Sequence, residues 1–216
     1  MKIDSIIFDL DGTLWNSTKT VADAWNEVFE QLGIQKQLSA DEVLRVMGLQ
    51  WPQIAETYFS EYAKDIQGEI KTRIDKNELV HIKKHGATPM PGMLSTIHSL
   101  KEKYRLFIVS NCQEGYVDAF LDLFDLWDDF EGFICAEVTG LSKGENNKML
   151  IKKYDLEAPV YVGDTSGDLE SARVAQIPFI YAKYGFGKID GKEEIKEIRC
   201  LNELEELLES MVSEEG

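Results

Sequence analysis

The sequence predicts an α/β fold with a Rossmann-like, mainly parallel sheet as its core and a small helical domain inserted near the N-terminus. Short apolar runs with the length of buried strands recur at residues 5–8, 106–109, 133–136, 160–162 and 179–181. Stretches with a helical spacing of apolar residues lie between these runs. This alternation favours parallel strands with helices on both faces, because each crossover returns the chain to the same end of the sheet.

The helices between the strands are predicted from apolar side chains three or four residues apart, which line one face of a helix. These side chains are Met93, Ile97 and Leu100; Val117, Phe120, Leu121 and Phe124; Met149, Leu150 and Tyr154; and Leu169, Ala172 and Ala175. The leucines of residues 201–211 predict one more amphipathic helix, whose glutamates face water.

Residues 17–85 interrupt the alternation, because they show one helical repeat after another and no convincing strand. Val21 and Val28 belong to one 3.6-residue repeat, and Ile70 and Ile74 belong to another. Prolines and a glycine then break helix formation before the next strand. We therefore predict an α/β core of residues 1–15 and 88–216 and an inserted helical domain of residues 16–87.

Composition limits the classes of partner and the compartment. The 216 residues carry a formal net charge of −16, from 39 acidic and 23 basic residues, so the field of the protein repels nucleic-acid backbones and anionic membranes. We expect neither as a partner. The three cysteines are widely spaced and form no CxxC pair, which favours reduced thiols. No signal-peptide pattern and no apolar run of bilayer length is present, and we expect a cytoplasmic protein.

The most specific motif follows the first predicted strand, where Asp9 and Asp11 stand one residue apart in the sequence FDLDGTL. In an open parallel sheet the carboxyl ends of the strands form the ligand site, so both carboxylates are expected there. Two adjacent carboxylates repel each other unless a cation relieves the repulsion. Oxygen ligands of this kind suit Mg²⁺, which binds one or two carboxylates and keeps positions for water and phosphate.

Further polar motifs follow later strands. Ser110 and Asn111 come after the second strand, and their hydroxyl, amide and backbone N–H groups can hold phosphoryl oxygens. Lys143 precedes a predicted helix and can neutralise charge on a nucleophile and on phosphate. Asp164 and Asp168 follow the fourth strand and can complete a metal site. Each signal is weak alone, but the ordered set is specific.

The ordered set resembles the four motifs of the haloacid-dehalogenase-like superfamily over almost the whole chain. The matching residues are Asp9-x-Asp11-Gly12-Thr13, Ser110-Asn111, Lys143 and Gly163-Asp164-(x)3-Asp168. The helical domain resembles the mobile cap of the subgroup that contains phosphoglycolate phosphatases and β-phosphoglucomutases. The resemblance implies a Mg²⁺-dependent phosphatase that acts on a small phosphorylated metabolite, of the phosphoglycolate or sugar phosphate type, as a monomer or homodimer.

The resemblance also implies a role for each motif residue. Asp9 would attack phosphorus and form a phospho-aspartate, Asp11 would act as general acid and base, and Lys143 would neutralise charge. Mg²⁺ would be held by Asp9, the backbone carbonyl of Asp11 and Asp164, with Asp168 supporting the site from outside the ligand set. Substrate phosphate would be bound by Ser110, Asn111 and Thr13.

Some residue assignments have alternatives. Many relatives have Lys-Pro where this chain has Lys143-Gly144, and Lys148 is a second candidate for the lysine. Thr13 can hold a loop or cap a helix instead of binding phosphate, and Asp168 can interact with a helix start. In the cap, Arg45, Gln50 and Trp51 are candidates for substrate contacts, although ordinary helix surface and cap core explain each of them singly.

Two other functions share part of the pattern. Phosphomutases carry all four motifs, so a mutase of the β-phosphoglucomutase type is the nearest competitor. Receiver domains also combine an acidic pocket, Mg²⁺, an acceptor aspartate and a lysine, which keeps a phospho-acceptor signalling module as a non-enzymatic alternative. Asp11 argues against haloacid dehalogenases and phosphonoacetaldehyde hydrolases, which lack an aspartate at the matching position.

Overall fold

The structure is a computed structural model that describes residues 3–189 and 195–213. The chain divides into two compact units, residues 16–88 and the remainder, residues 1–15 with 89–216. The two connecting segments, β2 (Trp15–Asn16) and β3 (Thr88–Pro89), pair as a two-stranded sheet.

A six-stranded sheet forms the core of the first unit, in the order β5-β4-β1-β6-β7-β8. All five neighbouring strand pairs are parallel, which confirms the predicted α/β fold. The strands are β1 (Ser5–Phe8), β4 (Arg105–Ser110), β5 (Gly132–Cys135), β6 (Pro159–Gly163), β7 (Phe179–Ala182) and β8 (Lys196–Ile198). Five of these strands, β1, β4, β5, β6 and β7, match the predicted runs to within one residue at each end, and β8 is additional.

β1 lies between β4 and β6 in the sheet, and every side chain of this strand is buried. Ile7 pairs in register with Phe107 of β4 on one side and with Tyr161 of β6 on the other. The chain runs outward from β1 through β4 to β5 and then returns to the opposite side at β6. This reversal places a topological switch point beside β1, where parallel sheets bind ligands at the carboxyl ends of their strands.

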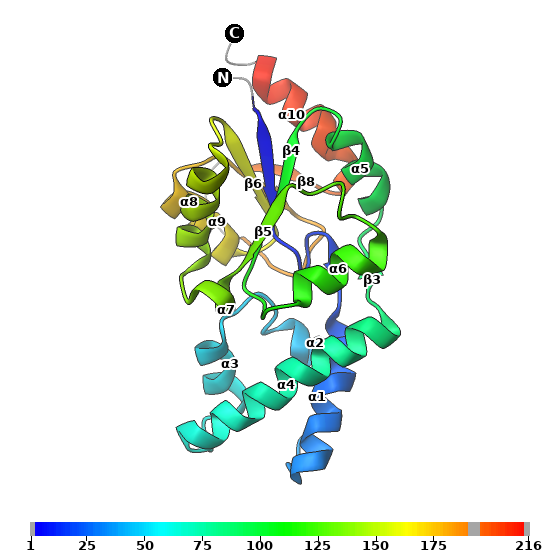
Figure 1. The fold of residues 1–216 in the computed structure, drawn as a ribbon, viewed down its shortest axis with the longest axis vertical. Helices are drawn as coiled ribbons and strands as arrows, with labels where there is room; N and C mark the ends of the chain where they lie inside the picture. The colour runs from blue at the N-terminus through cyan, green and yellow to red at the C-terminus, as the bar shows by residue number, and fades with distance from the viewer. Residues whose placement is uncertain (1–2, 190–194, 214–216) are drawn as a thin grey trace. The chain divides into compact units, whose positions relative to one another are not determined.

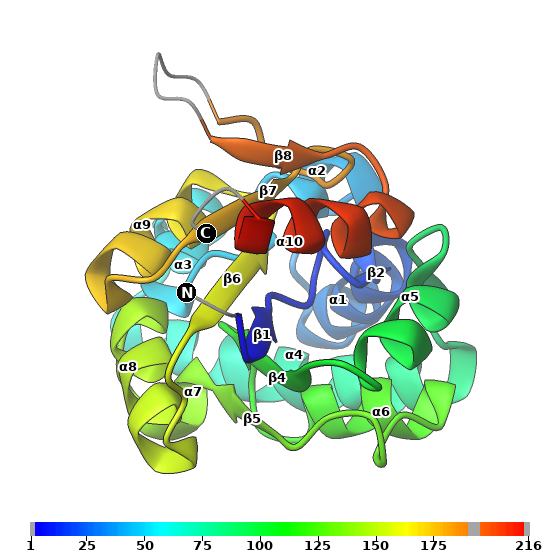
Figure 2. The same ribbon diagram turned by 90° about the horizontal axis from the view of Figure 1, so that it is seen from above.

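Helices cover both faces of the sheet (Figures 1 and 2). The helices α8 (Lys143–Tyr154) and α9 (Ser166–Ala175) pack on one face, where Leu150 and Ala172 join the core around Ile7. On the other face lie α5 (Met93–Leu100) and α10 (Leu204–Ser213), the latter preceded by the 3-10 turn η1 (Leu201–Glu203). The unit also contains α6 (Tyr116–Phe124) and the short α7 (Ala136–Thr139).

The second unit consists of helices α1 (Thr18–Leu32), α2 (Ala40–Leu44), α3 (Trp51–Tyr58) and α4 (Lys64–His85). Its core contains Trp25, Phe29 and Phe59, and Trp51 stacks on Phe59 with 5.6 Å between ring centroids. Trp51 thus contributes to the core of this unit. The role of the unit as a cap stays a prediction.

Among residues 3–189 and 195–213, no helix is both long and apolar enough to cross a bilayer. Cys112, Cys135 and Cys200 are all free.

Candidate active site

The loop after β1 turns sharply and is built around a glycine. The backbone N–H of Asp9 still donates to Val162 of β6 at 2.8 Å, and Leu14 then closes a turn onto the carbonyl of Leu10 at 2.8 Å. Gly12 has a φ of 87°, and a Cβ at this position would overlap the Asp164 carboxylate. Glycine is therefore required here for both conformation and space, and it brings the loop against Asp164.

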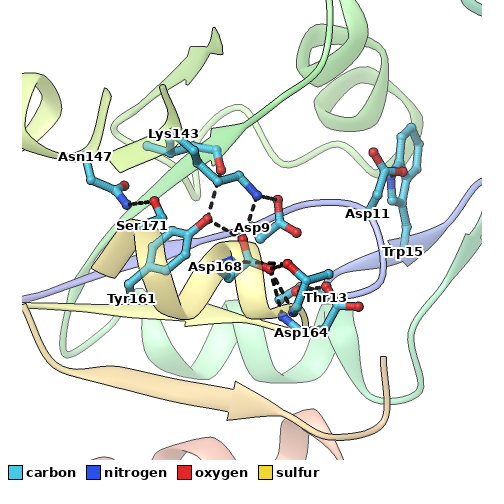
Figure 3. Close-up of polar contacts among 12 residues, drawn as sticks. Asp9, Asp11, Thr13, Trp15, Lys143, Asn147, Tyr161, Asp164, Asp168 and Ser171 are labelled. Atoms are coloured by element: carbon cyan, nitrogen blue, oxygen red, sulfur yellow. Dashed lines mark hydrogen bonds and ion pairs between the residues drawn. The ribbon is translucent and has the colours of Figure 1, made fainter. Parts of the chain in front are cut away.

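Lys143 is buried and bridges two carboxylates (Figure 3). It is the first residue of α8, after the N-cap Ser142. Its Nζ lies 2.6 Å from Asp9 Oδ1 and 2.7 Å from Asp168 Oδ1. Lys148, the other candidate from the sequence, is half exposed and pairs with Glu145 at 3.0 Å. The structure therefore brings Lys143, and not Lys148, to Asp9.

Asp168 combines two roles that the sequence left open. It is the third residue of α9, where its Oδ2 accepts from the backbone N–H of Thr165 at 2.9 Å and from the Thr165 hydroxyl at 2.7 Å. Its Oδ1 accepts from Lys143 and, at 3.2 Å, from the Tyr161 hydroxyl. Asp168 therefore closes a capping box at the helix start and also orients Lys143.

A loop that sequence reasoning missed holds Asp164. The backbone N–H groups of Phe186 and Gly187 donate to Asp164 Oδ2 at 2.6 and 3.2 Å, and the Thr13 hydroxyl donates to Oδ1 at 3.3 Å. The Tyr184 hydroxyl donates to the Thr13 backbone carbonyl at 2.8 Å. The signal that could have revealed this loop is the sequence YGFG, which begins three residues after the last predicted strand, since paired glycines allow close backbone approach.

Three carboxylates gather in this site. Asp9, Asp164 and Asp168 each present an oxygen within 4.8 Å of the others, and all three are buried. Burial, together with the charge of Asp168, raises the pKa of Asp164 to about 6, even though the Phe186 and Gly187 amides oppose the shift. Burial and the same charge also raise the pKa of Asp9 well above its usual range, although Lys143 opposes this.

Asp168 shows the opposite balance. Burial alone would raise its pKa, but Lys143 and the Thr165 hydrogen bonds outweigh burial and lower it. With Lys143 as the neighbouring cation, the ionised forms of Asp9 and Asp164 are therefore disfavoured. The donor set is all oxygen and carries more negative charge than one lysine balances, so a divalent cation with a preference for oxygen fits the site.

The Asp11 carboxylate lies apart from the triad, beside Trp15 (Figure 3). Its Oδ1 accepts from the Trp15 indole Nε1 at 2.9 Å and from the Tyr116 hydroxyl at 3.1 Å. Ser110 is buried at the end of β4, the strand beside β1, and Asn111 follows it. Both therefore lie at the same end of the sheet as Asp9. Binding of phosphate by Ser110, Asn111 and Thr13 stays a prediction.

Comparisons with known proteins agree with the motifs. The family model described as Haloacid dehalogenase-like hydrolase matches residues 6–182. The chain is 27% identical over 193 residues to the phosphoglycolate phosphatase of Aquifex aeolicus, covering 87% of this chain and 88% of that protein. It is 24% identical over 196 residues to the phosphoglycolate phosphatase of Rhodospirillum rubrum, covering 85% and 81%.

A solved structure of a predicted phosphoglycolate phosphatase from Haemophilus somnus has the same fold, with a TM-score of 0.81 at 19% identity over 96% of this chain and 98% of that one. The family match confirms the resemblance that the four motifs showed. It also confirms the expectation that the chain is an enzyme of a hydrolase family.

Proposed function

Because the chain belongs to the haloacid dehalogenase-like hydrolase family, we propose that it is a Mg²⁺-dependent phosphatase that acts through a phospho-aspartate on Asp9. The observation that carries the proposal is the buried Lys143 bridging Asp9 and Asp168 beside Asp164. Phosphoryl transfer depends mainly on positioning and on charge neutralisation, and this arrangement provides both.

Asp9 is suited to the role of nucleophile. It directly follows the central strand, one of its carboxylate oxygens is held by Lys143, and burial excludes bulk water from the group. Attack on phosphorus by Asp9 splits hydrolysis into two easier steps, formation and hydrolysis of an aspartyl phosphate. Asp11 is the proposed acid for the first step and base for the second.

The proposed Mg²⁺ ligands are Asp9, Asp164 and the backbone carbonyl of Asp11, with Asp168 outside the ligand set. The raised pKa values of Asp9 and Asp164 support a cation, since it would favour the ionised form of both. When bound, Mg²⁺ would supply charge stabilisation and orientation for the transferred phosphoryl group. Ser110, Asn111 and Thr13 are the proposed phosphate-binding residues.

The proposed substrate is a small phosphorylated metabolite of the phosphoglycolate or sugar phosphate type. Two curated relatives that span most of this chain are phosphoglycolate phosphatases, which supports a short phosphorylated acid as the first compound to test. A cytoplasmic location and a monomeric or dimeric state stay predictions.

The experiment that tests this function is phosphate release from a panel of 2-phosphoglycolate, sugar phosphates and p-nitrophenyl phosphate, each with Mg²⁺ and with EDTA. We expect release that depends on Mg²⁺ and differs in rate between compounds. Transfer of phosphate within a sugar phosphate, dependent on a bisphosphate activator and without net release, would identify a mutase instead. A stable phosphoprotein without turnover would support a signalling module.

Gly185 provides a separate test of the metal site. A Cβ at this position would overlap Asp164 and lie 2.6 Å from the Gly12 carbonyl oxygen. We expect Gly185→Ala to displace Asp164 and weaken Mg²⁺ binding by roughly tenfold to a hundredfold, the range found when groups that orient metal ligands are lost. Isothermal titration with Mg²⁺ measures this change directly.

Gly68→Ala is the matched control, because Gly68 lies inside α4 with nothing within 4 Å of an added Cβ. It should leave Mg²⁺ affinity unchanged and stabilise its helix by up to about 1 kcal/mol. Equal Mg²⁺ affinity in Gly185→Ala and wild type would contradict the role of the 184–187 loop.

A further inference from the structure

We propose that Trp15 and Tyr116 are positioning residues that hold Asp11 through its Oδ1, so that Oδ2 is the oxygen that transfers the proton. This inference rests on the proposed function, in which Asp11 is the general acid and base. Its basis is the convergence of two donors on one oxygen, with Trp15 Nε1 at 2.9 Å and the Tyr116 hydroxyl at 3.1 Å.

The two rings form a rigid support for Asp11. Trp15 is fully buried and Tyr116 is 2% exposed. The rings pack edge to face with 5.3 Å between their centroids, and Trp15 packs in the same manner on Phe120 and Phe124 of α6. Interlocked aromatic rings have few accessible rotamers, so both donor atoms stay in place. The carboxyl group they hold therefore has a defined direction.

The hydrogen-bond chemistry assigns different tasks to the two oxygens of Asp11. An indole N–H can only donate, and the Tyr116 hydroxyl donates to the same atom. Oδ1 can accept from both whether Asp11 is a carboxylate or a carboxylic acid, since the carbonyl oxygen of the acid remains an acceptor. The support is thus compatible with both protonation states, provided that the proton resides on Oδ2.

Asp11 Oδ2 gives up one proton in the first step and takes one back in the second. In the first, Asp9 bonds to phosphorus, the bond from phosphorus to the leaving oxygen breaks, and the proton on Asp11 Oδ2 passes to that oxygen. In the second, a water oxygen bonds to phosphorus, the bond from phosphorus to Asp9 breaks, and a proton of that water passes to Oδ2. Asp9 and Asp11 return to their starting states. Oδ1 keeps its two donors throughout.

The two residues of the support come from different parts of the sequence. Trp15 lies four residues after Asp11, and Tyr116 begins α6, 105 residues away. Both belong to the same compact unit as Asp11. Besides packing against each other, the two rings direct both of their polar atoms to one carboxylate, that of Asp11.

The test compares leaving groups. Tyr116→Phe removes only the hydroxyl, and Trp15→Phe removes the indole N–H. Each variant is assayed with p-nitrophenyl phosphate, whose leaving group departs without a proton, and with the alkyl phosphate that the wild type hydrolyses fastest. We expect kcat/KM to fall by roughly tenfold or more for the alkyl phosphate, a part of the ~10²–10⁴-fold that general acid catalysis contributes. For p-nitrophenyl phosphate kcat/KM should stay close to the wild-type value.

A second measurement reports on hydrolysis of the aspartyl phosphate, the step in which Asp11 acts as the base. Because hydrolysis of the aspartyl phosphate still needs Asp11, p-nitrophenyl phosphate should give these variants a burst of p-nitrophenolate followed by slower turnover. Trp127→Phe is the matched control, since it removes an indole N–H that donates to the Asp122 carboxylate at 2.7 Å on the surface. It should change neither the substrate ratio nor the burst.

The possible outcomes separate three cases. Equal losses of kcat/KM on both substrates, with no burst, would show that the rings serve packing alone and would overturn the inference. Unchanged kinetics in Tyr116→Phe would also overturn it, and this variant tests the inference even if Trp15→Phe fails to fold. A wild-type protein that releases phosphate from neither compound would overturn the proposed function and the inference with it.

Discussion

Replacing Asp9 with asparagine is expected to abolish turnover, with a loss of at least roughly 10³-fold in kcat. The reason is that an amide oxygen does not form the aspartyl phosphate on which both steps depend. Acid-quenched reactions with radiolabelled substrate should trap a labelled wild-type protein, while the variant carries no label. Residual turnover within about tenfold of wild type would contradict a nucleophilic Asp9.

The fold of this variant provides the control. Asparagine has the size of aspartate and retains an oxygen that can accept from Lys143, which keeps its second partner Asp168. Burial and neighbouring carboxylates disfavour the ionised form of Asp9, as its raised pKa shows. We therefore expect the thermal midpoint of Asp9→Asn in EDTA to equal or exceed that of wild type. A large fall would mean that lost activity reflects unfolding.

Lys143→Met is expected to lose both activity and stability. Methionine fills similar space but leaves Asp9 and Asp168 buried without a cation, and breaking a buried ion pair in this way costs about 3–5 kcal/mol. We expect this loss in the free energy of unfolding, measured by denaturant titration in EDTA. Phosphate release should fall by roughly 10²-fold or more, because a charge that stabilises the transition state is removed.

Lys148→Met is the matched control on the same helix. Lys148 is half exposed and pairs only weakly with Glu145, so its replacement should change the free energy of unfolding by no more than about 0.5 kcal/mol. The double variant Asp9→Asn with Lys143→Met should recover part of the lost free energy of unfolding. In it, only Asp168 remains as a buried carboxylate that has lost its lysine partner. Equal stability of the two lysine variants would contradict the proposed role of Lys143.

Much of the fold is predictable from local patterns. Buried strands such as β1 are short uninterrupted apolar runs, and α5 and α6 carry apolar residues at helical spacing. The elements that escaped prediction include β8 and α7, each for a physical reason. In β8 only Ile198 is buried, and charged Lys196 and Glu197 hide the pattern at the sheet edge. In α7 four residues are too few for a helical repeat to show.

The sequence alone determined the family and the end of the sheet at which the site forms. Asp9 and Asp164 directly follow buried strands, and parallel strands place such residues together whatever the details of packing. The ordered motifs then led to the haloacid dehalogenase-like family, which the family model confirms.

Only the tertiary structure decided which side chains meet. The sequence already favoured Lys143 over Lys148. The meeting of Lys143 with Asp9, the tyrosine partner of Asp11 and the amides that hold Asp164 all depend on contacts between distant parts of the chain. Periodicity reports which face of an element is buried, because that depends on neighbours within a few residues. Which polar atom finds which partner depends on how whole elements pack, and a single sequence does not contain that information in any local pattern.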